Sequence, residues 1–435
     1  MKKTLIMTLA LTILSATSCL KLDFYPHNSL SRYDIGADDI QQFYYGIYNL
    51  SQYKPTLSGY FCDDIIGGDL QRAGGSSAGW TARDLVTNLV MPNSFVGFWS
   101  GYYAWLYQVN CFLISVKELP EGAEKNKYLG TGYFFRGLIY YELTSRWREV
   151  PILREPTNES IPKQAEAKCW AFAEENFLLA EKYLDNFSGD RTYLSKQAAQ
   201  ALLARTYLAQ GKMTEAAAYA ETVIGSGYFS LDSWEHIWDG DINGNTEVIF
   251  CYANLNEDEA GLQMSSYFRG NPSYVPTSDF EKNVLTNDER YPYLAYADGQ
   301  YTTWNKYNTY GGYDPIIVTR LSEMYLISAE AKGKAAGLAR LNQLREKRGL
   351  SALAEKATPD EFIDDILAER RLELAEEGFR WFDLVRTNRY CKVMDLPEKY
   401  TVLPILVTQI ELSNGVLKQH PLWAGEPVAE TETKN

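Results

Sequence analysis

Residues 197–226 read QAAQALLARTYLAQGKMTEAAAYAETVIGS, and this stretch decides the fold. Its apolar residues recur at steps of three and four on both sides of a Gly-Lys turn, at Leu203, Ala204, Tyr207, Ala216, Ala220 and Val223. These offsets fit the tetratricopeptide pattern, in which small side chains let two helices approach closely while an aromatic ring fills the neighbouring groove. We therefore expect a helical hairpin over this stretch.

Three more helix pairs are predicted around this hairpin from apolar residues that recur at helical spacing. They join residues 40–50 to 95–119, 129–146 to 165–187, and 321–332 to 335–348. Because each hairpin leaves one apolar face uncovered, such pairs have to stack on one another. The expected fold class is all-α dominated, with four tetratricopeptide-like helix pairs forming a scaffold.

Two long insertions, residues 52–94 and 230–319, interrupt the helical segments. Both are rich in Gly, Asn, Asp, Pro and aromatic residues, so we expect them to be mostly irregular. Loops that a rigid scaffold holds in place often carry the residues that bind ligands. The function is therefore expected in these insertions.

Composition and charge exclude several classes of protein. The chain has 435 residues, of which 46% are hydrophobic and 23% charged, and these values exclude a disordered or collagen-like chain. Its formal net charge of -14 repels a phosphate backbone, so nucleic acid is not an expected partner. Aromatic residues make up 14% of the chain, and tyrosine is the commonest of them. Tyrosine joins an apolar ring to a polar tip, which suits a partly hydrated binding surface as well as a core.

The N-terminus predicts an exported protein with a lipid anchor. Lys2 and Lys3 precede an apolar run at residues 5–14, which is shorter than the roughly 20 residues that a membrane span needs. Residues 1–18 are therefore a predicted signal peptide. Small residues stand directly before Cys19, as in a bacterial lipobox, so Cys19 is the predicted site of lipidation. The alternative is an ordinary secreted protein in which this cysteine occurs by chance.

The rest of the chain gives the remaining domain boundaries. Residues 19–33 are predicted to form the lipidated cysteine and its tether, and residues 34–435 a single domain. The uncharged stretch at residues 95–116 is interpreted as a buried helix, because its apolar residues follow helical spacing and polar residues interrupt it.

Cysteine and histidine give little sign of a metal or a disulfide framework. Five cysteines remain after Cys19, an odd number without a C-x-x-C pair, and the chain has only three histidines, far apart in the sequence. No cofactor and no metal site are expected.

The candidate ligand-binding residues are aromatic and amide side chains in the two insertions. The glycine-rich stretch at residues 74–79 is followed by Trp80, which is our first candidate for ligand contact. The second insertion supplies the other candidates, namely Tyr274, Tyr296, Tyr301, Trp304, Asn305 and Tyr307. Rings beside amides suit a sugar, whose C–H faces stack on a ring while its hydroxyl groups form hydrogen bonds. The alternative is that most of these rings pack the insertion against the helices.

The last predicted helix begins with a capping box at Thr358 and Glu361, with Pro359 at its first position, and is expected to end at Gly378. It leads into residues 369–386, which read ERRLELAEEGFRWFDLVR. Glutamates and arginines three or four residues apart predict ion pairs on the helix surface rather than catalytic acids. A carboxylate beside so many arginines has little reason to hold a raised pKa.

This segment resembles the C-terminal signature of the SusD/RagB family of outer-membrane lipoproteins. Residues 320–331, RLSEMYLISAEA, residues 341–350, LNQLREKRGL, and the stretch 136–151 resemble further motifs of that family. The resemblance implies a right-handed superhelical scaffold and a lipid-anchored protein exposed on the cell surface. It also implies that the protein binds an oligosaccharide, passes it to a TonB-dependent SusC-like transporter in the outer membrane, and is not an enzyme. Asp63 and Asp64 resemble an acidic pair of the family and are expected to pin their loop.

Two other functions stay open. A peptide-binding, RagB-like uptake lipoprotein is the stronger alternative, because aromatic and amide surfaces also hold extended backbones. A glycoside hydrolase would need two carboxyl groups about 5 to 9 Å apart in a cleft, and no such pair stands out in the sequence.

Overall fold

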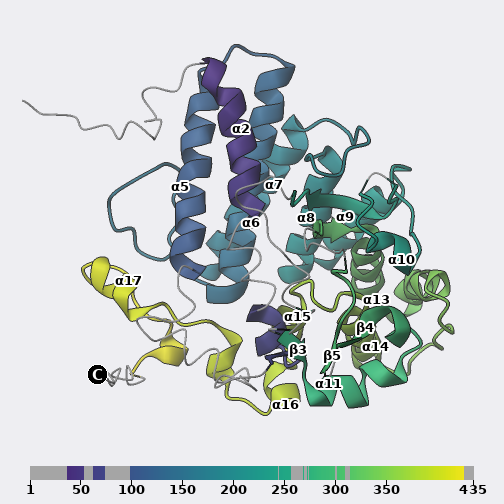
Figure 1. The fold of residues 1–435 in the computed structure, drawn as a ribbon. Coiled ribbons are helices and arrows are strands. Elements are labelled where there is room, and N and C mark those ends of the chain that lie inside the picture. The colour runs from purple at the N-terminus through teal and green to yellow at the C-terminus, as the bar shows by residue number, and fades with distance from the viewer. Residues whose placement is uncertain are drawn as a thin grey trace, which may run out of the picture.

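The structure is a computed structural model, and it describes residues 37–52, 62–73, 98–242, 244–255, 268, 272, 274–298, 301–308 and 314–425. Helices dominate this part of the chain, as Figure 1 shows. The predicted signal peptide, Cys19 and the tether at residues 19–33 lie outside the described residues. Within the described ranges, none of the helices combines the length and apolar character that crossing a membrane requires.

The four predicted helix pairs are confirmed. Their members are α2 (Ala37–Gln52) with α5 (Phe98–Lys117), α6 (Ala123–Trp147) with α7 (Glu166–Tyr183), α8 (Lys196–Ala209) with α9 (Met213–Ile224), and the two halves of α13 (Leu321–Lys347). Within α13, Gly333 has φ 70° and ψ 178°, so the chain breaks there into the two helices that the sequence predicts. A glycine takes this positive φ at little cost, which other residues do not.

Small side chains form the contact between α8 and α9, as the spacing predicted. Ala204, Ala216 and Ala220 are fully buried, and the rings of Tyr207 and Tyr219 lie 5.5 Å apart across the pair. The Ser195 hydroxyl accepts a hydrogen bond from the Ala198 N–H and so caps the start of α8. The pairs stack along one another in sequence order, and α9 packs against α13.

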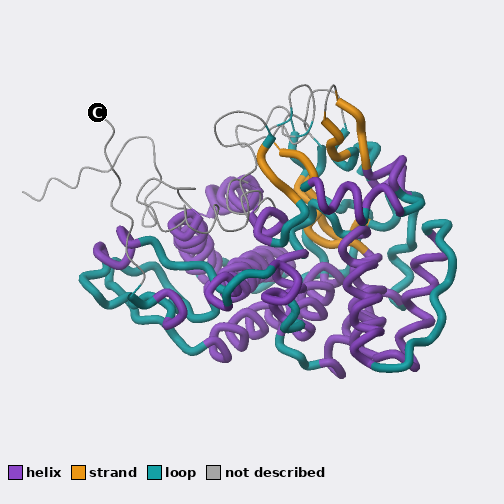
Figure 2. The backbone as a smooth tube through the Cα atoms, turned by 90° about the horizontal axis from the view of Figure 1, so that it is seen from below, coloured by secondary structure: helices purple, strands orange, loops and turns teal. Residues whose placement is uncertain are grey.

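The second insertion contains more regular structure than the sequence predicted. Its strands are β2 (Val248–Tyr252), β3 (Tyr274–Pro276), β4 (Ala295–Asp298), β5 (Tyr301–Trp304) and β6 (Ile316–Arg320). Helix α10 (Trp234–Ile237) precedes β2, and three short helices lie between β3 and β4: α11 (Ser278–Asn283), η2 (Leu285–Asn287) and α12 (Tyr291–Leu294). Strands β2 and β6 pair antiparallel, as do β4 and β5, while β3 pairs with β1 (Leu70–Arg72) from the first insertion. Figure 2 shows the strands together at one side of the helices.

The C-terminal part begins with α14 (Pro359–Glu373), and its capping box is confirmed. The Thr358 hydroxyl accepts from the Glu361 N–H, and the Glu361 carboxylate accepts from the Thr358 N–H. The helix ends at Glu373, earlier than the predicted Gly378, and a turn connects the two positions. The elements that follow are α15 (Arg380–Arg386), α16 (Tyr390–Met394), η3 (Glu398–Thr401), α17 (Val407–Leu412) and η4 (Pro421–Trp423).

One carboxylate ties the third helix pair to the fourth. Glu221 on α9 accepts from Arg340 at 2.5 and 2.8 Å, from Lys332 at 2.6 Å and from the Ser328 hydroxyl at 2.5 Å. The hydrogen bonds from Arg340, followed by those from Lys332 and Ser328, outweigh partial burial and lower the pKa of Glu221 to about 2. Such a carboxylate stabilises the fold above its unfolded pKa, and the stabilisation is lost as the pH falls through the folded value.

We therefore expect Glu221→Gln to lower the free energy of unfolding at pH 7 by about 1 to 2 kcal/mol, since the side chain is partly exposed. The difference from the wild type should shrink as the pH falls from about 4.5 to about 2. Urea unfolding of both proteins at several pH values checks this expectation. A difference that stays constant down to pH 2 would contradict the role given to the ionised carboxylate.

Candidate functional site

The candidate ligand-binding residues fall into three groups in the structure. Trp80 lies outside the described residues, and so does the side chain of Tyr301, whose backbone pairs with Asp298 in the β4–β5 register. Tyr296 on β4 is 40% exposed, and Asn305, directly after β5, is half-buried. The Asn305 N–H donates to the Leu294 carbonyl oxygen and closes the base of the hairpin. Tyr296 and Asn305 are thus brought to one hairpin.

Trp304 and Tyr307 do not form a hydrated surface, contrary to the prediction. Each is 1% exposed, and Tyr274 is also buried. The Trp304 ring packs 5.5 Å from that of Phe280, and the Tyr307 ring lies 5.9 Å from that of Phe268. The physical reason is that the strand pairs and short helices of the insertion need an apolar core of their own. This is the alternative that the sequence left open for most of these rings.

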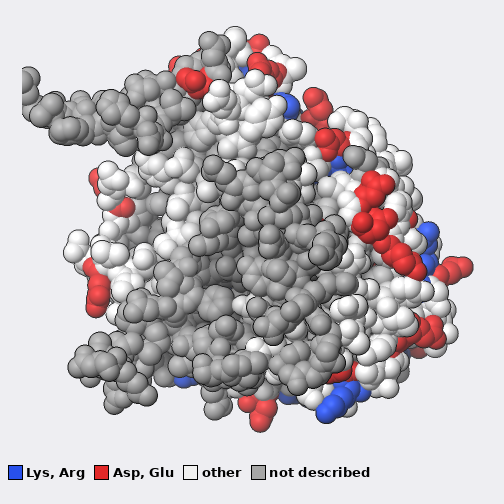
Figure 3. All heavy atoms as spheres, viewed as in Figure 1, with Lys and Arg blue, Asp and Glu red and all other residues white. Residues whose placement is uncertain are grey.

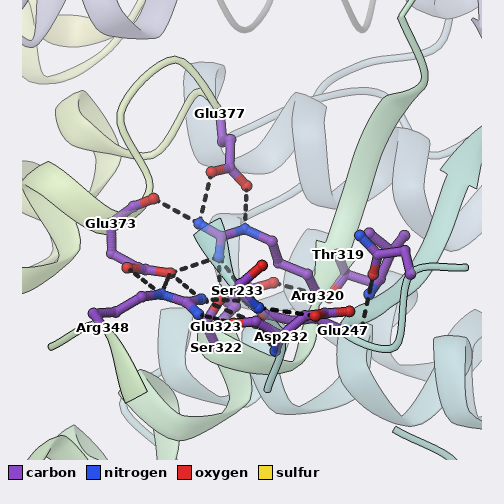
Figure 4. Close-up of polar contacts among 12 residues, drawn as sticks. Asp232, Ser233, Glu247, Thr319, Arg320, Ser322, Glu323, Arg348, Glu373 and Glu377 are labelled. Carbon is purple, nitrogen blue, oxygen red and sulfur yellow. Dashed lines mark hydrogen bonds and ion pairs between the residues drawn. The ribbon is translucent and has the colours of Figure 1, made fainter. Parts of the chain in front are cut away.

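Glutamates of the C-terminal signature form a buried network with arginines from other parts of the chain (Figure 4). The guanidinium of Arg320 lies 2.9 Å from Glu247, 2.6 Å from Glu373 and 2.8 Å from Glu377. The side chains of Arg320, Glu247 and Glu373 are all fully buried. The predicted surface ion pairs three or four residues apart are therefore wrong for this group, because its partners are distant in sequence and lie in the interior.

Further cations complete the network from the scaffold and from the second insertion. Arg348 on the scaffold contacts Glu247 at 2.8 Å and Glu373 at 2.7 Å. From the insertion, Arg290 contacts Glu369 at 2.6 Å and Lys306 contacts Glu377 at 2.7 Å. Burial disfavours the charge on Glu373, but Arg348 and Arg320 outweigh it and hold the pKa of Glu373 well below its usual range. The network fixes the insertion to the helices.

The first insertion is fixed by a short acidic segment at residues 62–69. Asp63 accepts from Arg146 at 2.7 Å, and Asp69 accepts from Arg371 at 2.5 Å. The Tyr390 hydroxyl donates to the Ile66 carbonyl oxygen at 3.1 Å. The expectation that Asp63 pins its loop is confirmed. Asp69 was missed, because nothing in the local sequence shows that α14 supplies its partner.

A pocket between α6, α8 and α15 gathers carboxylates of the kind that a glycoside hydrolase would need. Its lining includes Asp63, Glu142 and Asp383. Burial disfavours the charge on Asp383, yet Arg370 and Arg386 outweigh it and lower its pKa, so this group is no proton donor. Burial raises the pKa of Asp63 to about 7 against the opposing charge of Arg146. Its side chain is only 4% exposed, so a sugar does not reach it in this structure.

Other chemical groups are few in the described ranges. No group of three or more His, Cys, Asp or Glu side chains suited to a metal ion occurs there. No disulfide joins two of the described cysteines, and Cys391 is the exposed one among them. On the face seen in Figure 3, acidic side chains are scattered along the outer edges of the described surface, with fewer basic groups among them.

These features define a class of protein: a scaffold of stacked helical hairpins that carries long, aromatic-rich insertions. Comparison with known proteins agrees with this class. The SusD family matches residues 190–402, and the family described as "Starch-binding associating with outer membrane" matches residues 22–208. The chain belongs to the SusD/RagB family.

Individual relatives are distant in sequence but similar in fold. SusD-like protein P38 of Formosa agariphila is 26% identical over 388 residues, covering 72% of this chain and 76% of the relative. A solved structure called "Laminarin binding SusD-like protein" superposes with a TM-score of 0.77 at 21% identity, covering 88% of this chain and 99% of that one. A SusD superfamily protein from Bacteroides thetaiotaomicron also gives 0.77, at 22% identity, with coverage of 89% and 100%.

Proposed function

We propose that this protein is a glycan-binding lipoprotein of the cell surface. It captures an oligosaccharide and passes it to a TonB-dependent, SusC-like transporter in the outer membrane. The observation that carries the proposal is the match of nearly the whole fold to a laminarin-binding SusD-like protein, together with the starch-binding family that matches the N-terminal half. The protein acts by binding, without altering its ligand.

The chemistry of the β4–β5 hairpin supports a sugar ligand. Tyr296 on β4 is 40% exposed, and Tyr293 on the preceding helix α12 is 42% exposed. The amide of Asn305, directly after β5, is half-buried. A ring of this kind stacks on the C–H face of a sugar while an amide hydrogen-bonds its hydroxyl groups. The buried network that holds this insertion keeps such a surface in place before the ligand arrives, which lowers the entropic cost of binding.

We infer the location and the anchoring from the N-terminal sequence, with support from the family. The proposed signal peptide at residues 1–18 directs export, and a lipid on Cys19 anchors the chain to the outer membrane. The description of the matching family, which names association with the outer membrane, supports this location. Two or more acyl chains anchor a protein stably without any spanning helix.

Replacing Tyr296 by alanine tests the proposed binding surface. Loss of one stacking ring is expected to weaken binding of an oligosaccharide about tenfold, and Trp80→Ala should have an effect of the same order. Titration calorimetry with laminarin- and starch-derived oligosaccharides measures the change. Tyr228→Ala is the matched control, because Tyr228 is 41% exposed but lies outside the insertions. Equal affinities for all three variants would show that the ligand binds elsewhere.

A peptide ligand is the competing outcome of the same titration. If a mixed peptide digest binds and no oligosaccharide does, the protein is a RagB-like peptide-binding member of the family instead. Recovery of shortened oligosaccharides after incubation would point to hydrolysis.

A further inference from the structure

Two exposed tyrosine rings lie on the helical scaffold, outside both insertions. Tyr45 on α2 is 48% exposed, and Tyr193, between α7 and α8, is 37% exposed. Both rings lie against the buried ring of Tyr44, at centroid distances of 5.4 and 6.4 Å. Because they flank one buried ring, Tyr45 and Tyr193 form a single aromatic surface, which we call the scaffold tyrosine surface.

The ring of Tyr193 is held in its exposed position by contacts from several sides. It stacks on Tyr44 with an interplanar angle of 2°, and the Nζ atom of Lys127 lies 5.5 Å from its centroid. The N–H of Leu194, the next residue, donates to the Tyr48 hydroxyl oxygen at 3.1 Å and so fixes the backbone. A ring that is already fixed loses little conformational freedom when a ligand stacks on it, which favours binding.

A polar groove continues this surface along α2 and α6. Gln41 in its lining lies one helical turn before Tyr45 on α2, so the two side chains share a face of that helix. Glu124, also in the lining, accepts from the Tyr128 hydroxyl at 2.9 Å, and the Tyr128 ring lies 4.9 Å from that of Tyr44. The groove has a volume of about 500 Å³, which is within the usual range for sites that bind small molecules.

The charged side chains of the groove favour a neutral ligand over an anionic one. Its lining includes the carboxylates of Glu121 and Glu124 and the ammonium group of Lys125. Lys125 donates to the Lys117 and Leu119 carbonyl oxygens, both at 2.9 Å, and to Glu121 at 2.8 Å. A lysine ammonium has three protons to donate, so none is left for an anion. The carboxylates can accept further hydrogen bonds, so the groove suits a ligand that donates them.

Fixed rings beside hydrogen-bond acceptors suit a sugar, whose C–H face stacks on a ring while its hydroxyl groups donate to carboxylate and amide oxygens. We propose that the scaffold tyrosine surface and the adjoining groove form a second binding site, which takes a neutral glycan. The inference rests on the proposed function, because it assigns a further site to the same class of ligand. The start of α2 lies at the top of Figure 1, whereas the β4–β5 hairpin lies at the lower right. The two sites are therefore separate.

Titration calorimetry with neutral oligosaccharides from laminarin and starch tests the proposal, and the wild type should show two classes of site. Tyr193→Ala should weaken one class about tenfold and leave the other unchanged, because it removes a single stacking ring. Tyr296→Ala should do the reverse. Tyr107→Ala is the matched control, because Tyr107 is 45% exposed on α5 but belongs to neither site. Tyr45→Ala provides a second variant of the scaffold tyrosine surface if Tyr193→Ala fails to fold.

The outcomes of this titration separate the inference from the proposed function. Oligosaccharide binding that neither Tyr193→Ala nor Tyr45→Ala weakens would overturn the second site and leave the proposed function standing. Binding that Tyr193→Ala weakens and Tyr296→Ala does not would support the site on the scaffold and remove the one at the hairpin. A wild type that binds no oligosaccharide would overturn both proposals.

Discussion

Replacing Arg320 by alanine is expected to lower the free energy of unfolding by about 3 to 5 kcal/mol. The guanidinium contacts Glu247, Glu373 and Glu377, and it is fully buried. Without it, these carboxylates keep their desolvation cost but lose a shared positive charge. Since the total stability of a domain is commonly about 5 to 15 kcal/mol, the variant should be close to unfolding at moderate temperature.

Urea unfolding monitored by circular dichroism measures the loss. Arg154→Ala is the matched control, because Arg154 forms an ion pair with Glu175 in which the two side chains are 58% and 44% exposed. Its removal should cost less than about 1 kcal/mol. Arg320→Lys should fall between the two, because lysine keeps the charge but cannot form the forked hydrogen bonds of arginine. Equal losses for Arg320→Ala and Arg154→Ala would contradict the structural role given to the buried network.

Replacing Gly337 by alanine is expected to cost about 2 to 3 kcal/mol. A Cβ atom at this position would lie 1.9 Å from the carbonyl oxygen of Ala329 and 2.7 Å from its carbonyl carbon. Both are backbone atoms, so the two halves of α13 would have to move apart. The close approach that defines the fourth helix pair depends on this glycine.

Gly46→Ala is the matched control, with an effect of the opposite sign. Gly46 lies on the exposed side of α2, and a Cβ atom there would meet no other atom of the described residues within 4 Å. Alanine favours a helix over glycine by about 0.5 to 1 kcal/mol, so this variant should gain stability. The difference in unfolding midpoint between the two variants reports on helix contact alone. Stabilisation by Gly337→Ala would show that the two halves of α13 are not packed as described.

The helix pairs could be predicted from sequence because their determinants are local. The spacing of small residues around Ala204 and Ala216 specifies a close hairpin, and the break in the fourth pair falls at Gly333, between the two predicted helices. The capping box at Thr358 is likewise contained within four residues. Where neighbouring residues contain the whole signal, the prediction agrees with the structure.

The network and the insertions could not be predicted in the same way. Arg320 and Glu377 are 57 residues apart, and β1 pairs with β3 across roughly two hundred residues, so no local pattern indicates either contact. Tyr296 and Trp304 lie on the paired strands β4 and β5, yet the ring of Tyr296 is 40% exposed and that of Trp304 is buried. Only the pairing register of the hairpin and the apolar core of the insertion decide which of the two rings is exposed. The polar neighbours of an aromatic residue therefore do not show that the ring faces solvent.

The central claim is that inert helical hairpins hold a surface that binds a glycan without changing it. Calorimetric titration of the purified chain with neutral oligosaccharides from laminarin and starch, followed by mass spectrometry of the recovered ligand, tests this claim most directly. The account predicts saturable binding of at least one oligosaccharide, which is recovered at its original length, and no binding of a peptide digest. Binding of peptides alone, or recovery of shortened oligosaccharides, would contradict it.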